Sequence, residues 1–485
     1  MHRQRRREGY YDTAGIRYAT LVVDTSGEAR SRLLPRRGGR PISYFPARYL
    51  LNVIECPMLS GGGNYQTGGW KAHWILIVCL SLYTLSYMDR VALTVVLQPM
   101  KLEMGWSDTQ MGAIQTVYML SYGLLAIPTA YLVDRWSRKK AIGVLALMLN
   151  AFSGLTGLAW NFVSVIIPRI FCGAGASGVV TGSIAMITAA YPRIRHGRAM
   201  GIFSMGIPLG IALGAIVGGV MAHRFGWRSP FLLLGGIGLL LSLAAFFLKD
   251  YRTVKEGVTV SLGGLWQSTV VLLKIPTLRW YFMGYAMMLV TSLAQINWMP
   301  TYLIRQFDIG TDTAGYLTCA ISLVAIIGAP LGGVLSDFWY KRNRKGRLWL
   351  PAVSSSVSSV IMAASFLAFS RSFALGLALI FLFGIINMVA IPALSVISQD
   401  VVPVAYKGLS HGVAALCMYA LGGAWAPVLV GGISDSLGGG ANGLMWAVVI
   451  ACSGGLLAGI CFTMGARHYI ADEDRVRGSV LSSDQ

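Results

Sequence analysis

Twelve apolar segments follow one another along the chain after residue 70, each close to the ~20 residues that an α-helix needs to cross a bilayer. Inside a bilayer every backbone polar group must be hydrogen-bonded within the protein, so such segments form helices. Only 12% of the 485 residues are charged and 55% are apolar, too little charge to cover the surface of a soluble protein. The sequence therefore predicts an all-α polytopic membrane protein. The segments lie at residues 72–98, 110–132, 141–160, 163–190, 199–222, 229–248, 279–303, 314–336, 349–369, 373–398, 410–433 and 443–465.

Two motifs occur twice at one spacing, which indicates a duplicated unit. Asp134 in A-Y-L-V-D-R-W-S-R-K-K and Asp337 in G-V-L-S-D-F-W-Y-K-R are 203 residues apart (337 − 134), as are Gly112 and Gly315 (315 − 112). Duplicated halves in a membrane chain are typical of carriers built from two helical bundles. We expect two pseudo-symmetric six-helix bundles at residues 71–248 and 279–466, joined by a cytoplasmic linker at 249–278 and followed by a cytoplasmic tail at 467–485.

The first 70 residues differ in composition from the rest. They hold eleven Arg against five acidic residues and contain no long apolar run. This pattern predicts a disordered basic tail that lies near anionic lipid, and it does not match a secretory signal. An alternative is that translation begins at Met58, which would leave a much shorter tail.

The placement of basic residues predicts the orientation in the membrane. Loops after even-numbered segments, between residues 134 and 407, hold 18 Lys and Arg when Arg279 at the edge of the seventh segment is included, whereas loops after odd-numbered segments hold five. By the positive-inside rule both termini are cytoplasmic, as expected of a multi-pass protein of the cell (inner or plasma) membrane. The net charge of +20 thus orients the protein and implies no nucleic-acid partner. The five bases on the other side are Lys101, Arg224, Arg228, Arg305 and Arg371.

The sequence contains no pattern typical of a metal site, a cofactor or an enzyme. The seven cysteines are scattered, mostly inside the apolar segments, without a C-x-x-C or a ligand-spaced cluster. No nucleophile–base pair appears either. We therefore expect a protein that is not an enzyme and that uses no cofactor.

Three ionisable residues lie inside the apolar segments away from their ends. They are Asp89 and Arg90 in the first segment and Arg169 in the fourth. Charges at such positions are energetically costly and usually functional. At a rise of ~1.5 Å per residue, Asp89 lies ~6 Å and Arg169 ~10 Å to the outer side of the bilayer midplane. The two side chains can therefore form an ion pair if their helices are neighbours.

Helical spacing separates Arg90 from Asp89. Tyr83, Tyr87, Arg90 and Thr94 share one helix face, as expected of a wall that lines a water-filled cavity, whereas Asp89 lies about 100° around the helix. We predict that Arg90 points into the pathway and that Asp89 points toward Arg169. Two cations against one carboxylate favour an anionic ligand. Protonation of Asp89 would release Arg169 and couple proton and substrate movement; the alternative, a purely structural ion pair, leaves Arg90 unexplained.

The second half carries neutral polar residues in place of charges. Gln295 and Asn297 lie in the seventh segment and Asn387 in the tenth. They are candidate substrate-binding residues, and the alternative is that each satisfies a backbone group or a neighbouring helix. A cavity charged on one wall and amide-lined on the other suits an amphipathic anion.

The repeated aspartates end their apolar segments on the cytoplasmic side, where they predict a gate. Asp134 can accept hydrogen bonds from the N-terminus of a helix in the opposite bundle, because the helix dipole favours a carboxylate there. The neighbouring bases can hold acids or lipid phosphates, and these contacts would close the cytoplasmic side. Positive-inside topology alone is an alternative explanation for the bases but not for the two aspartates. The predicted gate residues are Asp134, Arg135, Arg138, Lys139, Asp337, Lys341 and Arg342.

Over residues ~72–465 the chain resembles the major facilitator superfamily. The superfamily's loop signature resembles G-x-x-x-D-R-x-G-R-R/K, and this chain matches it apart from the replacement of the two glycines by Ala130 and Ser137. The resemblance implies two six-helix bundles that move by rocker-switch alternating access. The matching positions are Ala130, Asp134, Arg135, Ser137, Arg138 and Lys139.

Within the superfamily, four motifs resemble the bacterial Spinster-like group and the related anion:cation symporters. They are Y-M-D-R (87–90), S-D-T-Q-M-G (107–112), G-I-F-S-M-G-I-P-L-G (201–210) and G-W-R-S-P-F (226–231), while N-W-M-P-T-Y-L (297–303) resembles the symporters. Both groups carry Arg-x-x-x-Gly-x-Gly-Glu on the fourth span, and this chain has Ala176 where that Glu would stand. Symport through Asp89 alone, antiport and uniport are therefore all open alternatives.

These observations predict a secondary transporter that moves a small organic anion. The resemblance to the symporters implies a sugar acid or another carboxylate, whereas the resemblance to Spinster implies a lipid or an amphipathic molecule. A carrier-derived sensor that binds without transport is a further alternative. The expected partners are the anionic substrate, protons and membrane lipid, with the chain acting as a monomer.

Overall fold

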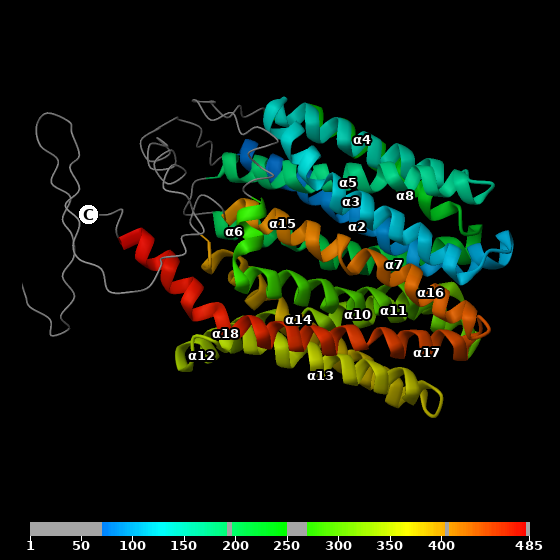
Figure 1. The fold of residues 1–485 in the computed structure, drawn as a ribbon. Coiled ribbons are helices and arrows are strands. Elements are labelled where there is room, and N and C mark those ends of the chain that lie inside the picture. The colour runs from blue at the N-terminus through cyan, green and yellow to red at the C-terminus, as the bar shows by residue number, and fades with distance from the viewer. Residues whose placement is uncertain (1–69, 192–195, 250–268, 403–406, 482–485) are drawn as a thin grey trace, which may run out of the picture. The chain divides into compact units, whose positions relative to one another are not determined.

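The computed structural model describes residues 70–191, 196–249, 269–402 and 407–481, which form α-helices and their connections (Figure 1). The first half of the chain contains α2 (Trp70–Met104), α3 (Asp108–Arg135), α4 (Arg138–Gly157), α5 (Phe162–Ala190), α6 (His196–Ser204), α7 (Gly206–Phe225) and α8 (Ser229–Phe246). The second half contains α10 (Pro276–Phe307), α11 (Thr311–Ala325), α12 (Gly328–Arg342), α13 (Gly346–Phe369), α14 (Phe373–Asp400), α15 (Lys407–Ala420), the 3₁₀ turn η3 (Gly423–Trp425), α16 (Ala426–Ser436), α17 (Ala441–Ala451) and α18 (Ser453–Leu481).

The prediction of an all-α, twelve-span membrane fold is confirmed. Each predicted span coincides with one helix or with consecutive helical pieces. Within the described ranges, eleven helical segments are long and apolar enough to cross a membrane. The remaining predicted span, 279–303, lies in α10, a 32-residue helix that contains the polar residues Gln295 and Asn297. The predicted basic tail, including Met58, and most of the linker fall outside the described residues.

The last helix continues beyond the predicted second bundle. The segment expected as a tail from residue 467 is helical in α18 as far as Leu481. Two acidic residues attach this extension to the bundle: Asp472 accepts hydrogen bonds from the backbone and hydroxyl of Thr277, and Glu473 accepts from Arg344 and Tyr340. These contacts explain why the helix continues past the apolar segment.

Side-chain caps position the ends of several helices. The Ser107 hydroxyl accepts from the backbone N–H of Gln110, whose side chain accepts from the N–H of Ser107, so α3 begins with a capping box. Asn161 and Ser164 form the same reciprocal pair at the start of α5. Caps of this kind satisfy orphan N–H groups and thereby define where a helix begins.

Four predicted spans are interrupted rather than continuous. The fifth is divided at Met205 into α6 and α7, the eighth at residues 326–327 into α11 and α12, and the twelfth at Cys452 into α17 and α18. The eleventh is divided into α15, η3 and α16, around Gly422. Interrupted helices in carriers commonly lie beside substrate sites.

The two halves contact each other mainly through four helix pairs. The first half packs on the second through α3 with α16, α7 with α11, α2 with α10, and α3 with α15. The first three of these pairs meet toward the end of the bundles where α3 begins, here called the Asp108 end. At the opposite end, here called the Asp337 end, α6 and α12 pack mainly within their own halves.

The repeated glycines lie at two of these contacts between halves. A Cβ atom on Gly112 of α3 would lie 2.2 Å from the Pro427 carbonyl oxygen in α16, and one on Gly315 of α11 would lie 2.4 Å from the Ala215 carbonyl oxygen in α7. Only glycine allows this approach of two backbones. The pair separated by 203 residues therefore occupies equivalent contacts in the two halves.

Candidate functional site

The predicted pairing of Asp89 with Arg169 is confirmed. Asp89 of α2 is 2% exposed and Arg169 of α5 is 0% exposed. Arg169 Nη1 lies 2.8 Å from Asp89 Oδ2, and the Ser153 hydroxyl of α4 donates to Asp89 Oδ1. Three helices of the first half thus meet at one carboxylate. Because both charges are removed from water, each depends on the other for stabilisation.

Arg169 keeps unused hydrogen-bonding capacity. Its Nε and Nη2 atoms are buried and lack a partner in the described part of the chain. Its guanidinium lies 4.8 Å from the centre of the Phe231 ring, a cation–π contact from α8. The aromatic face and the single carboxylate therefore balance the charge of this arginine but leave two of its nitrogen atoms without an acceptor.

Arg90 faces a different environment from Asp89, as the helical spacing predicts. The side chain is partly exposed, and its Nη1 donates to the Tyr419 hydroxyl of α15 at 3.3 Å. Its guanidinium lies 5.8 Å from the ring centres of both Tyr87 and Tyr419. Tyr122 of α3 contacts the Tyr419 ring edge-on. Arg90 thus joins the two halves through aromatic side chains and has no carboxylate partner among the described residues.

Of the other residues predicted to share the face of Arg90, only Tyr87 lies beside it. Tyr83 is buried and stacks on Phe203 of α6 at 4.5 Å between ring centres, while its edge contacts Tyr87. Thr94 is buried and donates to the carbonyl of Val91 in its own helix. Tyr87 therefore lies beside Arg90, whereas Tyr83 and Thr94 are held in packing contacts.

The three polar residues predicted in the second half are buried and differ in their partners. The Asn387 amide exchanges hydrogen bonds with Ser292, which links α14 to α10. The Asn297 amide nitrogen donates to the carbonyl of Leu293, and its oxygen has no partner in the described ranges. Gln295 is 7% exposed and makes no hydrogen bond to any described residue. Two amides thus keep free capacity, while Asn387 mainly joins two helices.

The predicted cytoplasmic gate has no contact across the halves among the side chains that the structure describes. Asp337 is exposed without a hydrogen bond or ion pair, and Arg342 lies over the ring of Phe338 in its own helix. Lys341 is also exposed. Arg138 donates to the carbonyl of Ala185 in its own half. Lys139 is partly buried, and the side chains of Asp134 and Arg135 lie outside the described set. The gate at this end stays a prediction.

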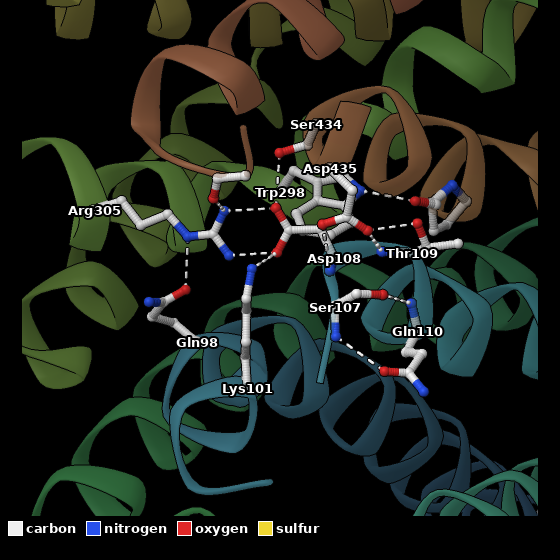
Figure 2. A network of polar contacts seen from close by, with 12 residues as sticks. Gln98, Lys101, Ser107, Asp108, Thr109, Gln110, Trp298, Arg305, Ser434 and Asp435 are labelled. Carbon is white, nitrogen blue, oxygen red and sulfur yellow. Dashed lines mark hydrogen bonds and ion pairs between the residues drawn. The ribbon is translucent and has the colours of Figure 1, made fainter. Parts of the chain in front are cut away.

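A polar network joins the halves at the opposite, Asp108 end (Figure 2). Asp108 of α3 is 0% exposed, and its carboxylate accepts from three side chains. Lys101 Nζ lies 2.6 Å from it, Arg305 of α10 donates two hydrogen bonds at 2.6 and 2.7 Å, and Ser434 of α16 donates at 2.7 Å. Arg305 also donates through Nε to Gln98 of α2 at 2.7 Å.

A second carboxylate of this network caps a helix of the other half. Asp435 of α16 accepts from the backbone N–H of Asp108 at 2.9 Å and of Thr109 at 2.7 Å, and from the Thr109 hydroxyl at 2.6 Å. The helix dipole favours a carboxylate at this N-terminus. The arrangement expected for Asp134 thus occurs at Asp435, at the opposite end of the bundle.

Sequence reasoning missed Tyr419, Ser153 and the whole Asp108 network. Only five basic residues lie in the loops after odd-numbered segments, and Lys101 and Arg305 are two of them. This scarcity is a sequence signal that could have identified both. Asp435 in G-G-I-S-D-S echoes the S-D of the motif that holds Asp337, and Tyr419 directly precedes the interruption at Gly422. Metal-binding clusters of His, Cys, Asp and Glu are absent from the described ranges.

Comparison with known proteins places this geometry in a family. Residues 79–427 match the Major Facilitator Superfamily. A hexuronate transporter of Bacillus subtilis (strain 168) is 28% identical over 273 residues, which are 55% of this chain and 64% of that protein, so the match spans just under two thirds of its length. A probable sulfoacetate transporter of Cupriavidus necator is 30% identical over 297 residues, which are 58% of this chain and 68% of that protein.

A solved structure agrees with the fold. A bacterial homologue of the human lysosomal transporter Spinster, in an inward-facing and unoccupied conformation, superimposes with a TM-score of 0.75 at 21% identity, covering 83% of this chain and 98% of that one. The chain belongs to the Major Facilitator Superfamily, and its relatives are named transporters rather than enzymes. It is accordingly a multi-pass membrane protein.

Proposed function

We propose that this protein carries a small organic anion across the cell membrane by alternating access of its two halves, and that Arg90 binds the anionic group. The observation that carries the proposal is the environment of Arg90, a half-buried arginine without a carboxylate partner in the described chain, beside an interrupted helix of the opposite half. A guanidinium offers paired donors to a carboxylate or a sulfonate. The names of the hexuronate and sulfoacetate transporters support an anion of this class.

The neighbouring residues have distinct proposed roles. Tyr87 and Tyr419 position the guanidinium, which lies 5.8 Å from the centre of each ring, and Gln295 and Asn297 supply the amides of the second half. Asp89 exchanges a proton and thereby releases or retains Arg169 during the cycle. Both termini are cytoplasmic in this proposal, because the loops rich in basic residues then lie on the inner side.

The proposal is tested by uptake into proteoliposomes. The purified protein is expected to accumulate one of a panel of hexuronates, aldarates, sulfonates and short carboxylates, with lysolipids included for the Spinster-like alternative. Arg90→Gln is expected to raise the half-saturating anion concentration by ~10- to 100-fold, because charge-assisted hydrogen bonds to the substrate are lost. Arg371→Gln, which changes an exposed arginine, is the control. Unchanged saturation in Arg90→Gln would place the anion elsewhere.

Tyr419→Phe is expected to bind the anion ~2- to 5-fold more tightly than the unaltered protein. The substrate competes with the Tyr419 hydroxyl for the same guanidinium, and phenylalanine removes this competitor while keeping the ring. Titration calorimetry measures the change. Weaker binding would instead mean that the hydroxyl contacts the substrate directly.

A further inference from the structure

We propose that Asp108, Arg305 and Asp435 form a reversible lock that holds the two halves together at the Asp108 end and opens by exchange of ion-pair partners. With the orientation expected from the basic loops, this lock is the gate on the outer side. The inference rests on the movement of two halves in alternating access. It does not depend on the identity of the substrate.

The contacts of the network divide into two kinds. Arg305 to Asp108, Ser434 to Asp108 and Asp435 to the start of α3 all join residues of different halves. Lys101 to Asp108 joins two residues of the first half. Separation of the halves therefore breaks the first kind of contact and leaves the second intact.

Each half keeps one acid and one base when the lock opens. The first half retains Asp108 with Lys101 at 2.6 Å. The second half retains Arg305 and Asp435, both of which lie near Gly439: Arg305 donates to the Gly439 carbonyl at 3.0 Å, and Asp435 Oδ1 lies 3.8 Å from the position of a Cβ on Gly439, beside Lys101 Nζ at 3.9 Å. Breaking a buried pair is strongly destabilising when one charge is left without a partner. An exchange between neutral pairs avoids this cost, so the lock can open and close repeatedly.

Backbone contact brings the carboxylates within reach of their partners. A Cβ on Gly431 of α16 would lie 2.3 Å from the Asp108 carbonyl oxygen, and only glycine permits that approach. The adjacent Gly432 is different, since a Cβ there would lie 3.7 Å from the Thr109 hydroxyl oxygen, an ordinary contact. The close contact between α3 and α16 at the lock thus depends on Gly431, which packs against the backbone of Asp108.

The equivalent contact of the other helix pair is weaker. Between α7 and α11, a Cβ on Gly219 would lie 2.6 Å from the Thr311 carbonyl oxygen, as at Gly431, but Thr311 stands where α3 has Asp108 (311 − 108 = 203). The charged or titratable contact there is His223 Nδ1 with Asp312 Oδ1 at 3.7 Å, and both side chains are partly exposed to solvent. Exposed pairs contribute little. Of the two equivalent helix pairs, only α3 with α16 therefore carries the lock.

Pulsed EPR on the full chain without substrate tests this inference. Spin labels are attached at Leu158→Cys and Arg371→Cys, exposed positions of the two halves at the Asp108 end, after replacement of the native cysteines. Arg305→Gln is expected to raise the ratio of long to short distances by ~10-fold or more, because its two bonds to Asp108 exist only in the closed state. Lys101→Gln is the control. It also removes one positive charge that pairs with Asp108, but from the same half, and it is expected to have a much smaller effect.

The comparison separates a lock from a purely structural cluster. Equal distance distributions in Arg305→Gln and Lys101→Gln, or no change in either, would overturn the proposal. Should Arg305→Gln fail to fold, the pair Gly431→Ala and Gly432→Ala serves in its place, and the lock requires that only the first lengthens the distances. The distances are measured without substrate in proteins that keep Arg90, so failure of the anion proposal is distinguishable from failure of the lock.

Discussion

Asp89→Asn is expected to lower the free energy of unfolding by about 3–5 kcal/mol and to flatten the pH dependence of transport. Asparagine removes the charge that stabilises Arg169, which is 0% exposed and already has two nitrogen atoms without an acceptor. The amide can still accept from Ser153 but cannot exchange a proton at neutral pH. Thermal unfolding in detergent measures the first effect, and uptake into proteoliposomes across pH 5–9 at about unit intervals measures the second.

Ser153→Ala is the matched control for this prediction. It removes one hydrogen bond from the same carboxylate but leaves the ion pair, so a loss of about 1 kcal/mol and an unchanged pH profile are expected. The double variant Asp89→Asn with Arg169→Gln removes both charges and is expected to recover part of the stability without restoring transport. A pH profile in Asp89→Asn equal to that of the unaltered protein would refute proton exchange at Asp89.

Gly173→Ala is expected to lower the free energy of unfolding by about 3 kcal/mol, at the upper end of the range for overpacking. A Cβ on Gly173 of α5 would lie 2.3 Å from the Tyr118 carbonyl oxygen and 3.0 Å from the Tyr122 backbone nitrogen of α3. Because both atoms belong to the backbone, no change of rotamer relieves the contact and the two helices must separate. Arg169 lies one turn before Gly173 and would move with it. The shift should therefore weaken transport as well. A melting curve measures the loss of stability, and an uptake assay on the same preparation measures the loss of transport.

Gly236→Ala is the control for the same substitution in a helix of the same half. Apart from its chain neighbours and the backbone of its own helix, no atom lies within 4 Å of the position of a Cβ on Gly236 of α8. Alanine is also the better helix former, so this variant should be as stable as the unaltered protein or slightly more stable. Equal melting temperatures for the two variants would mean that α3 and α5 can separate without loss.

The helical spans and their polar residues could be predicted from the sequence because they depend on local chemistry. Apolar length located the twelve spans, and the cost of a buried charge singled out Asp89, Arg90 and Arg169. Helical periodicity separated the directions of Asp89 and Arg90, which the structure confirms with one in an ion pair and the other beside tyrosines. The interruptions in four spans were not predicted, since composition gives only the length of an apolar run.

Contacts between the halves could not be predicted in the same way. Arg90 and Tyr419 are separated by 329 positions in the chain, and Asp108 and Asp435 by 327. Periodicity says which face of a helix a side chain occupies but not which helix that face meets. The sequence predicts a helix-capping contact at Asp134, which stays a prediction, and it gives no sign of the one that the structure shows at Asp435, at the other end of the bundle.

The sequence by itself determined that this chain is a duplicated, twelve-span membrane protein with a charged pair in its first half, because bilayer thickness and the cost of buried charge act on each segment separately. The tertiary structure decided which residues of the two halves meet. It did so through backbone contacts at Gly112 and Gly431, where the absence of a side chain brings α3 and α16 together and places Asp108 among Arg305, Ser434 and Asp435. Close packing of distant segments is a property of the whole fold, and no local pattern specifies it.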